Sequence, residues 1–171
     1  MITTSQKTLL RNALSKSFDE FIATLSLFSD DEINRIPFAG SWTPAQVASH
    51  IILATDGVPD VDTSFNDRPF DAFLPMIRPW WEDLSQKFTA PEPLRPDGKL
   101  RSLNMLLDEL NRVREKDLTI IDTEDLTAVC MDFELPTIGY LTRYEWLWFI
   151  EMHLNRHTFQ LKNIRNKMVS H

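Results

Sequence analysis

Two histidines four residues apart, His153 and His157, form the clearest chemical pattern in the sequence. They stand in the run His-Leu-Asn-Arg-His, and on a helix this spacing puts both imidazoles on one face, about one turn apart. Such an arrangement suits two nitrogen ligands of one metal ion. The same spacing also occurs among ordinary polar or half-buried histidines, so the pair alone does not decide between the two interpretations.

The neighbouring residues indicate that both rings face a helical interior. Apolar residues recur at steps of three and four over 146–168, and the two histidines fall in or beside that stripe. Earlier in the chain, His50 lies between Val47 and Ile51 on another apolar face. Each unsatisfied buried polar group costs roughly 1–3 kcal/mol. A divalent cation would satisfy the three imidazoles together, and the competing interpretation is a hydrogen-bonded polar layer in the core.

Three histidine ligands leave one coordination position for water or substrate. The residues do not identify a catalytic side chain. We expect the histidines to act as metal ligands and a metal-bound water or a substrate thiolate to act as the nucleophile. Glu145 and Glu151 are candidate bases on the same segment, although neither falls clearly on the inward face. Gln160 follows His157 by about one turn and is a candidate to orient that ring.

Four long helices are needed to carry these residues, and apolar spacing predicts them at about 4–28, 43–55, 100–121 and 142–168. The second has the strongest start signal, because Thr43 can cap, Pro44 fits the first helical position, and Gln46 completes a capping box. Thr142 and Glu145 form a second possible capping box at the start of the last helix.

Two irregular excursions separate the last three helices. Residues 58–100 hold seven of the ten prolines and many aromatic residues, with one short helix expected around 70–88. The aromatic content predicts a segment packed on the bundle, because a free linker would not carry so many large apolar rings. Residues 122–141 form the second excursion, which Pro136 and Gly139 close.

Composition predicts one all-α domain over residues 1–171, a four-helix bundle. The chain has only four glycines, whereas all-β folds use many in their turns. The net charge of -7 argues against nucleic-acid binding. We find no signal peptide and no apolar stretch long enough for a membrane span, so a cytoplasmic location is expected. Cys130 is the single cysteine, which excludes an intrachain disulfide and suggests a small core residue.

The run Trp42-Thr43-Pro44-Ala45-Gln46 followed by His50, together with His153 and His157 on the last helix, resembles the DinB-like superfamily. That superfamily includes YfiT-type metal-dependent hydrolases and bacterial thiol-dependent transferases. The resemblance implies a four-helix bundle with up-down-down-up connectivity. It also implies that His50, His153 and His157 bind a divalent metal, nickel or zinc. Residues 58–100 fit the family pattern least well.

Two classes of function follow. The first is a metal-dependent hydrolase or thiol-dependent transferase that acts on a small molecule. The alternative is a non-enzymatic, stress-related protein, either a small-molecule binder or a structural domain with a vestigial metal site. A homodimer is also expected, because five tryptophans and eleven phenylalanines exceed the evident needs of a four-helix core. His171, at the end of the chain, belongs to neither the metal site nor the polar-layer interpretation.

Overall fold

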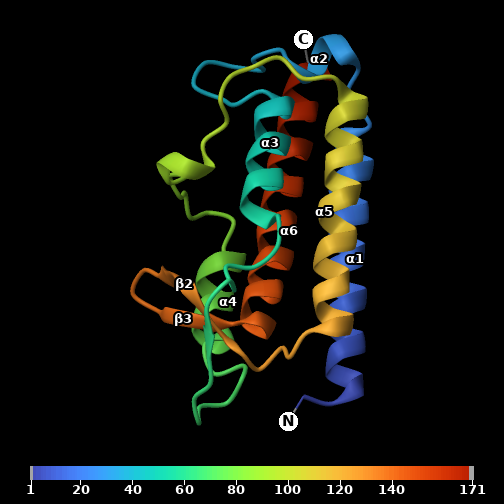
Figure 1. Ribbon diagram of the computed structural model, residues 1–171. Helices are drawn as coiled ribbons and strands as arrows, with labels where there is room; N and C mark the ends of the chain where they lie inside the picture. Colours follow the sequence, from blue (N-terminus) through green and yellow to red (C-terminus); the bar gives the residue numbers. More distant parts are fainter. Residues whose placement is uncertain (1, 170–171) are drawn as a thin grey trace.

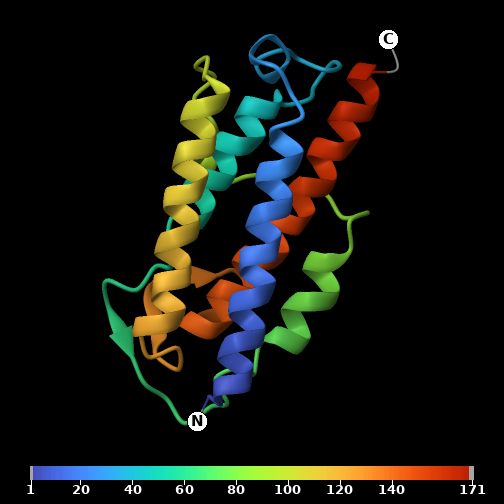
Figure 2. The same cartoon turned by 90° about the vertical axis from the view of Figure 1, so that its right-hand side faces the viewer.

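Helices dominate the computed structural model, which describes residues 2–169. The elements in chain order are α1 (Thr4–Leu25), α2 (Asp30–Ile33), α3 (Pro44–Thr55), β1 (Thr63–Ser64), α4 (Leu74–Glu82), the 3₁₀ helix η1 (Glu92–Leu94), α5 (Leu103–Thr123), β2 (Val129–Leu135), β3 (Gly139–Thr142) and α6 (Arg143–Val169). The long helices α1, α3, α5 and α6 lie side by side, and α4 and the strands lie toward the end that holds the N-terminus (Figures 1 and 2). His171 lies outside the described residues.

The four long helices do not simply alternate in direction along the chain. In Figure 1 the chain runs away from the N-terminal end along α1, back along α3, in the same direction along α5, and away again along α6. Because α3 and α5 run in the same direction, the chain must return along the length of the bundle between them. Residues 56–102 make that return, which gives the first excursion its length.

Capping boxes define the starts of the helices that carry the histidines. The Thr43 hydroxyl accepts from the Gln46 amide N–H at 3.1 Å, and the Gln46 side chain accepts from the Thr43 N–H at 2.9 Å. Thr142 and Glu145 exchange the equivalent bonds before α6, at 3.2 Å and 2.9 Å. Both predicted boxes are therefore confirmed, and they fix where the two helices begin.

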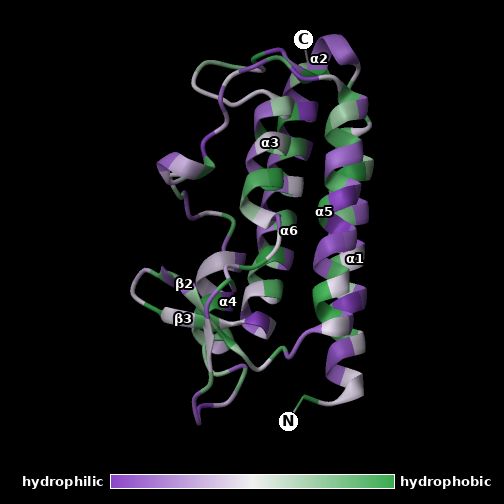
Figure 3. Cartoon of the chain, in the orientation of Figure 1, coloured by the Kyte–Doolittle hydropathy of each residue, from purple (hydrophilic) through white to green (hydrophobic). Residues whose placement is uncertain are grey.

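The main core lies between the four long helices and is continuous along their length. Phe18 and Phe21 from α1 and Leu110 from α5 are fully buried there. Figure 3 shows green and purple alternating around each long helix, as expected for helices that bury one face and expose the other. In the described part of the chain, no helix has the length and apolar character needed to cross a membrane.

A small antiparallel sheet corrects the prediction of an all-α chain. The predicted excursion at 122–141 contains β2 and β3, and β1 from the first excursion pairs with β2 through Thr63 and Cys130. Local propensity did not reveal β2, because Val129 is its one β-branched residue. The pairing with β1 joins segments that are far apart in sequence, so it leaves no local signal.

A second apolar cluster joins α4, the sheet and α6. Its buried members include Ile77, Cys130, Leu141 and Phe149. The helix expected around 70–88 is present but shorter, from Leu74 to Glu82. This cluster confirms that residues of the first excursion pack on the bundle, and it brings α4 next to the histidine-bearing part of α6.

Candidate metal centre

The three predicted histidines come together between two neighbouring helices. His50 lies in the middle of α3, and His153 and His157 lie on successive turns of α6. The Nε2 atoms of His50 and His153 are 3.1 Å apart. Ring centroids are 4.8–5.1 Å apart for all three pairs, and one ligand atom from each residue lies within 4.8 Å of the others. We refer to these three side chains as the imidazole triad.

Two of the three rings have their orientation fixed by a hydrogen bond from Nδ1. His50 Nδ1 is 2.8 Å from the carbonyl oxygen of Leu94, and His157 Nδ1 is 2.7 Å from Oε1 of Gln160. Because both oxygens can only accept, both Nδ1 atoms carry the proton. The Nε2 atoms of these two rings therefore carry lone pairs, and that of His50 lies at hydrogen-bond distance from His153 Nε2.

His153 differs from the other two histidines. Its Nδ1 atom is buried and has no hydrogen-bond partner within residues 2–169. The ring is held instead by aromatic contacts, edge-on to Trp81 with centroids 5.5 Å apart and to Phe149 with centroids 5.9 Å apart. Two rings of the triad are thus oriented by hydrogen bonds from Nδ1, and the third by packing and by the contact of its Nε2 with His50.

Burial favours the neutral form of all three imidazoles. Burial lowers the pKa of His50 below its usual value, and it lowers the pKa of His153 well below. Burial, with a smaller contribution from the neighbouring His50, lowers the pKa of His157 to about 4. A neutral imidazole with a free Nε2 lone pair is the form that binds metal ions.

The donor set fits a divalent cation. Two nitrogens bound to one tetrahedral zinc lie about 3.4 Å apart, given Zn–N bonds of about 2.0–2.1 Å. The 3.1 Å separation of the His50 and His153 Nε2 atoms is close to that value. In the described structure the group that could hold a metal consists of these three histidines, with no carboxylate or thiolate among them. Imidazole donors suit zinc, nickel, copper and iron more than magnesium or calcium.

Aromatic rings flank His50 and His153 and limit their contact with water, whereas His157 is half-buried. The Trp42 ring is 5.2 Å from His50, and Trp81 and Phe149 flank His153. As a result His50 and His153 are only 3% and 7% exposed. Apolar walls keep the imidazoles neutral and strengthen any electrostatic contact made inside the site.

Neither of the two candidate bases lies at the triad. Glu145 is fully buried, so the expectation that it does not point clearly inward is wrong, but its carboxylate binds Arg68 and backbone amides near the start of α6. Glu151 accepts from Ser17 on α1 and from Asn155. It stands two residues before His153, which places it about 200° around the helix.

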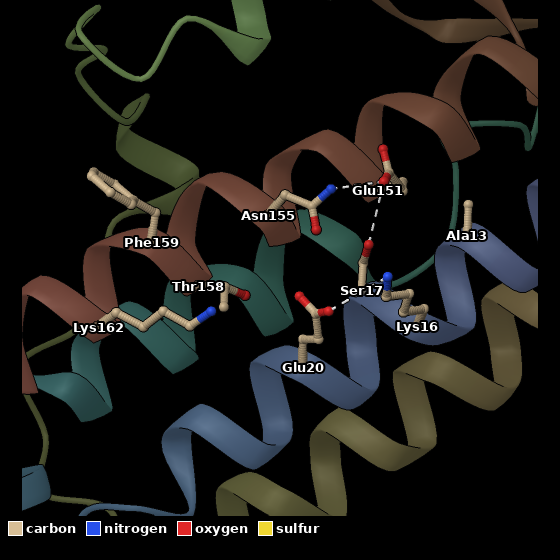
Figure 4. Close-up of a pocket in the computed structure, with 9 residues that line it drawn as sticks. All are labelled: Ala13, Lys16, Ser17, Glu20, Glu151, Asn155, Thr158, Phe159 and Lys162. Carbon is tan, nitrogen blue, oxygen red and sulfur yellow. Dashed lines mark hydrogen bonds and ion pairs between the residues drawn. The ribbon is translucent and has the colours of Figure 1, made fainter.

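That opposite face of α6 forms a separate groove. Figure 4 shows Glu151 and Asn155 on α6 facing Ser17 and Glu20 on α1. The groove has a volume of about 420 Å³ and also includes Lys16 among its lining residues. None of its lining residues belongs to the triad, so the groove and the triad are distinct features.

Three further groups contribute to the site without having been predicted from the sequence. The carbonyl of Leu94 orients His50, Trp81 packs on His153, and Arg156 anchors the backbone beside Trp81. Trp81 stands in an aromatic-rich stretch, but no local pattern assigned it to the histidines. Cys130, by contrast, is a buried core residue as expected, and burial raises the pKa of its thiol to about 12.

Comparisons with known proteins match most of the chain. The model of the DinB superfamily matches residues 13–161. A Bacillus subtilis (strain 168) protein described as "Uncharacterized protein YuaE" is 26% identical over 144 residues, which cover 82% of this chain and 87% of that protein.

The fold also has a counterpart among solved structures. YfiT from Bacillus subtilis is described as a probable metal-dependent hydrolase with an unusual four-helix bundle topology. It matches with a TM-score of 0.61 and 14% sequence identity, covering 98% of this chain and 90% of YfiT. At that identity the likeness shows the fold alone. Because the family model spans all three histidines and most of the sequence, the chain belongs to the DinB superfamily.

Proposed function

We propose that the protein is a metal-dependent enzyme that acts on a small molecule, with a divalent cation held by His50, His153 and His157. The observation that carries the proposal is the convergence of three imidazoles, two of which have Nδ1 bound to an acceptor and so carry a lone pair on Nε2. The Nε2 atoms of His50 and His153 lie at hydrogen-bond distance from each other, and a metal ion would replace that contact by binding both nitrogens.

Each residue of the site has a defined task in this proposal. The triad supplies the ligands, and Leu94 and Gln160 hold two of the rings in the metal-binding tautomer. Trp42, Trp81 and Phe149 limit the access of water. When bound, a divalent cation supplies a Lewis acid that makes a water molecule or a thiol more acidic.

Hydrolysis is the leading reaction class, and thiol-dependent transfer is the second. YfiT, which shares the fold, is described as a probable metal-dependent hydrolase, and that description supports hydrolysis by analogy alone. Nickel and zinc are the proposed metals, in keeping with the nitrogen donor set. A homodimer and a cytoplasmic location stay predictions. Sedimentation of the purified protein would test the first.

A specific observation favours the non-enzymatic alternative as a second candidate. His50 and His153 are nearly inaccessible, at 3% and 7% exposure. A metal held by two such buried ligands could serve binding or stability without turnover. The two candidates differ in the effect of metal removal. If the protein is an enzyme, its large apolar core should keep the chelated protein folded. If the metal is structural, chelation should unfold the protein.

The decisive experiment is elemental analysis of the protein purified without a polyhistidine tag. We expect about one divalent ion per chain in the wild type and none in His153→Ala, because the variant loses one of three ligands. His171→Ala removes the one histidine outside the triad and serves as the matched control. It should retain the metal.

Circular dichroism of the same samples separates the two candidates. His153→Ala and the chelated wild type should keep their helicity if the site is reactive. A metal-free wild type would refute the proposal, and unfolding on chelation would favour the structural alternative. Activity screens against small esters, amides and thiol acceptors would follow with the metal found.

A further inference from the structure

A stretch of the first excursion completes the metal centre from outside the bundle. We call residues 81–94 the cover segment. At its start Trp81 lies edge-on to His153, and at its end the Leu94 carbonyl accepts from His50 Nδ1. The segment therefore touches the triad at two points. Between the end of α4 and the start of η1 it has no regular secondary structure.

One side chain of α6 binds the backbone of this segment three times. Arg156 Nη2 donates to the carbonyl oxygens of Trp81 and Asp83 at 2.9 Å and 2.8 Å, and Nη1 donates to that of Gln86 at 2.9 Å. The guanidinium also lies 4.7 Å from the Phe88 ring centroid. Hydrogen bonds from a charged donor are the stronger kind, and the planar guanidinium can serve several acceptors at once.

The segment needs such an anchor because α4 ends without a cap of its own. The last carbonyls of a helix have no partners within the helix, and a positive side chain at that end can satisfy them. Trp81 is in the last turn of α4, and Asp83 is its C-cap residue. The guanidinium of Arg156 thus takes the role of a cap supplied by a different helix.

Aromatic packing and the Arg156 guanidinium hold the Trp81 side chain, and the guanidinium carbon lies 5.4 Å from the Trp81 ring centroid. This ring is stacked on Phe88, with centroids 4.5 Å apart and an interplanar angle of 20°, and it also contacts Phe149 at 4.6 Å. The indole Nε1 is buried and has no hydrogen-bond partner in the described chain. The position of Trp81 against His153 therefore depends on the backbone that Arg156 binds.

We propose that Arg156 is a positioning residue that holds the cover segment closed over the imidazole triad, so that metal enters and leaves when these three hydrogen bonds open. The proposal rests on the metal site proposed above. Arg156 directly precedes His157 in the chain, so the anchor and a ligand share one helical turn. Closure of the segment and the geometry of the site are thereby coupled.

The variants that test this proposal are Arg156→Met, Arg156→Lys and the control Arg165→Met. Methionine keeps much of the apolar stem and removes every donor. Lysine keeps the charge but lacks the planar fork. Arg165 is a matched control on the same helix, because it also donates to a partner, Glu32, and packs on an aromatic ring, that of Phe28, away from the triad.

The first measurement is hydrogen–deuterium exchange followed by mass spectrometry, which needs no metal. In Arg156→Met, amides of the cover segment should exchange at least about tenfold faster, since one charge-assisted hydrogen bond already contributes about that factor. Peptides of α3 and α5 should be unchanged. Arg156→Lys should lie between the wild type and Arg156→Met, and Arg165→Met should match the wild type in this segment.

The second measurement is the release of bound Zn²⁺ to an excess of a chromophoric chelator. We expect Arg156→Met to release Zn²⁺ about tenfold faster, at the scale on which outer partners affect metal sites, with partial rescue by lysine. Unchanged exchange in Arg156→Met would overturn the anchoring role. Faster exchange with an unchanged release rate would overturn the gating role.

The two measurements separate this proposal from the proposed function. A wild type that takes up no Zn²⁺, Ni²⁺ or other divalent ion would refute the metal centre and, with it, the gating of metal. The exchange measurement would still decide whether Arg156 holds the segment. Should Arg156→Met fail to fold, Arg156→Lys carries both measurements, because it keeps the charge and the stem.

Discussion

The first turn of α6 and its middle both bury polar side chains, Glu145 at the first and His153 at the second. The Glu145 carboxylate accepts from both terminal nitrogens of Arg68 and from the backbone N–H groups of Phe73 and Thr142. Both of its oxygens are therefore satisfied by the protein. His153 Nδ1, within residues 2–169, has no partner, and its Nε2 faces another imidazole nitrogen.

This difference separates a structural polar cluster from a candidate functional one. The protein provides every partner for Glu145, so the cluster joins the first excursion, the end of β3 and the start of α6 into one unit. In the triad, two outer Nδ1 atoms have protein acceptors, whereas His153 Nδ1 has none within residues 2–169, and the inner Nε2 atoms of His50 and His153 contact each other. Completeness of hydrogen bonding, more than burial, distinguishes the two.

Removal of the Glu145 carboxylate should produce the largest change in stability. Glu145→Ala leaves the Arg68 side chain, which is 18% exposed, without its carboxylate partner, although it keeps the backbone carbonyls of Pro69 and Tyr140 as acceptors. Breaking a buried pair costs about 3–5 kcal/mol. Urea unfolding would measure the loss. Metal content of the folded variant should stay at the wild-type level, because His153 lies about two turns away along α6.

Glu134→Ala is the matched control, since Glu134 is an exposed carboxylate on β2. Its effect on the free energy of unfolding should lie within about 0.5 kcal/mol. Equal urea midpoints for the two variants would break the comparison, because they would show that the satisfied cluster contributes nothing beyond a surface charge.

The triad should give the opposite response when an outer partner is removed. Gln160→Ala deletes the acceptor of His157 Nδ1, and loss of such a partner lowers metal affinity about 10–100-fold. Competition with a chromophoric chelator would measure the affinity for Zn²⁺. The melting temperature of the chelated protein should change little. Asn163→Ala, at an exposed position of the same helix, should leave the affinity unchanged and serves as the control.

Asp117 on α5 is intermediate between Glu145 and the triad in how completely its polar atoms are hydrogen-bonded. Its Oδ1 accepts from the Gly57 N–H at 3.1 Å, whereas its buried Oδ2 has no partner in the described residues. Burial raises the pKa of Asp117 well above its ordinary value of 3.8, and nearby Asp56 adds to the shift, with Lys116 opposing it. At pH values between the ordinary and the raised pKa, the folded protein therefore retains a proton on Asp117 more strongly than the unfolded chain does.

The smallest predicted effect is a change in the pH dependence of stability. Because the folded-state pKa of Asp117 is raised, its contribution to the free energy of unfolding is fully present below about pH 4. That contribution falls as the pH rises toward the folded-state pKa. Asp117→Asn should remove that decline. Urea unfolding between pH 4 and 8 would measure the slope, with Asp108→Asn as an exposed control on α5. Equal slopes in wild type and Asp117→Asn would contradict the prediction.

Several features could be read directly from the sequence. Apolar residues at spacings of three and four indicated the four long helices and the inward faces of His50 and His153, because a helix brings such residues onto one face. The two capping boxes followed from a Thr with a Gln or Glu three residues later. Helix ends were less certain, and α1 ends at Leu25 instead of about residue 28. The helical bundle and the family are confirmed, whereas the metal-binding role of the triad, the single domain and the homodimer stay predictions.

The remaining features depend on contacts between distant parts of the chain. Local spacing placed the histidines on inward faces, but the partner of His50 is a carbonyl 44 residues away. The partner of Glu145 is an arginine 77 residues away, and β1 pairs with a strand beyond α5. Periodicity reports what lies on one face of one element, whereas these contacts depend on how separate elements pack. The sequence alone therefore determined that His50 and His153 face inward, and the tertiary structure decided which protein groups contact the buried polar side chains.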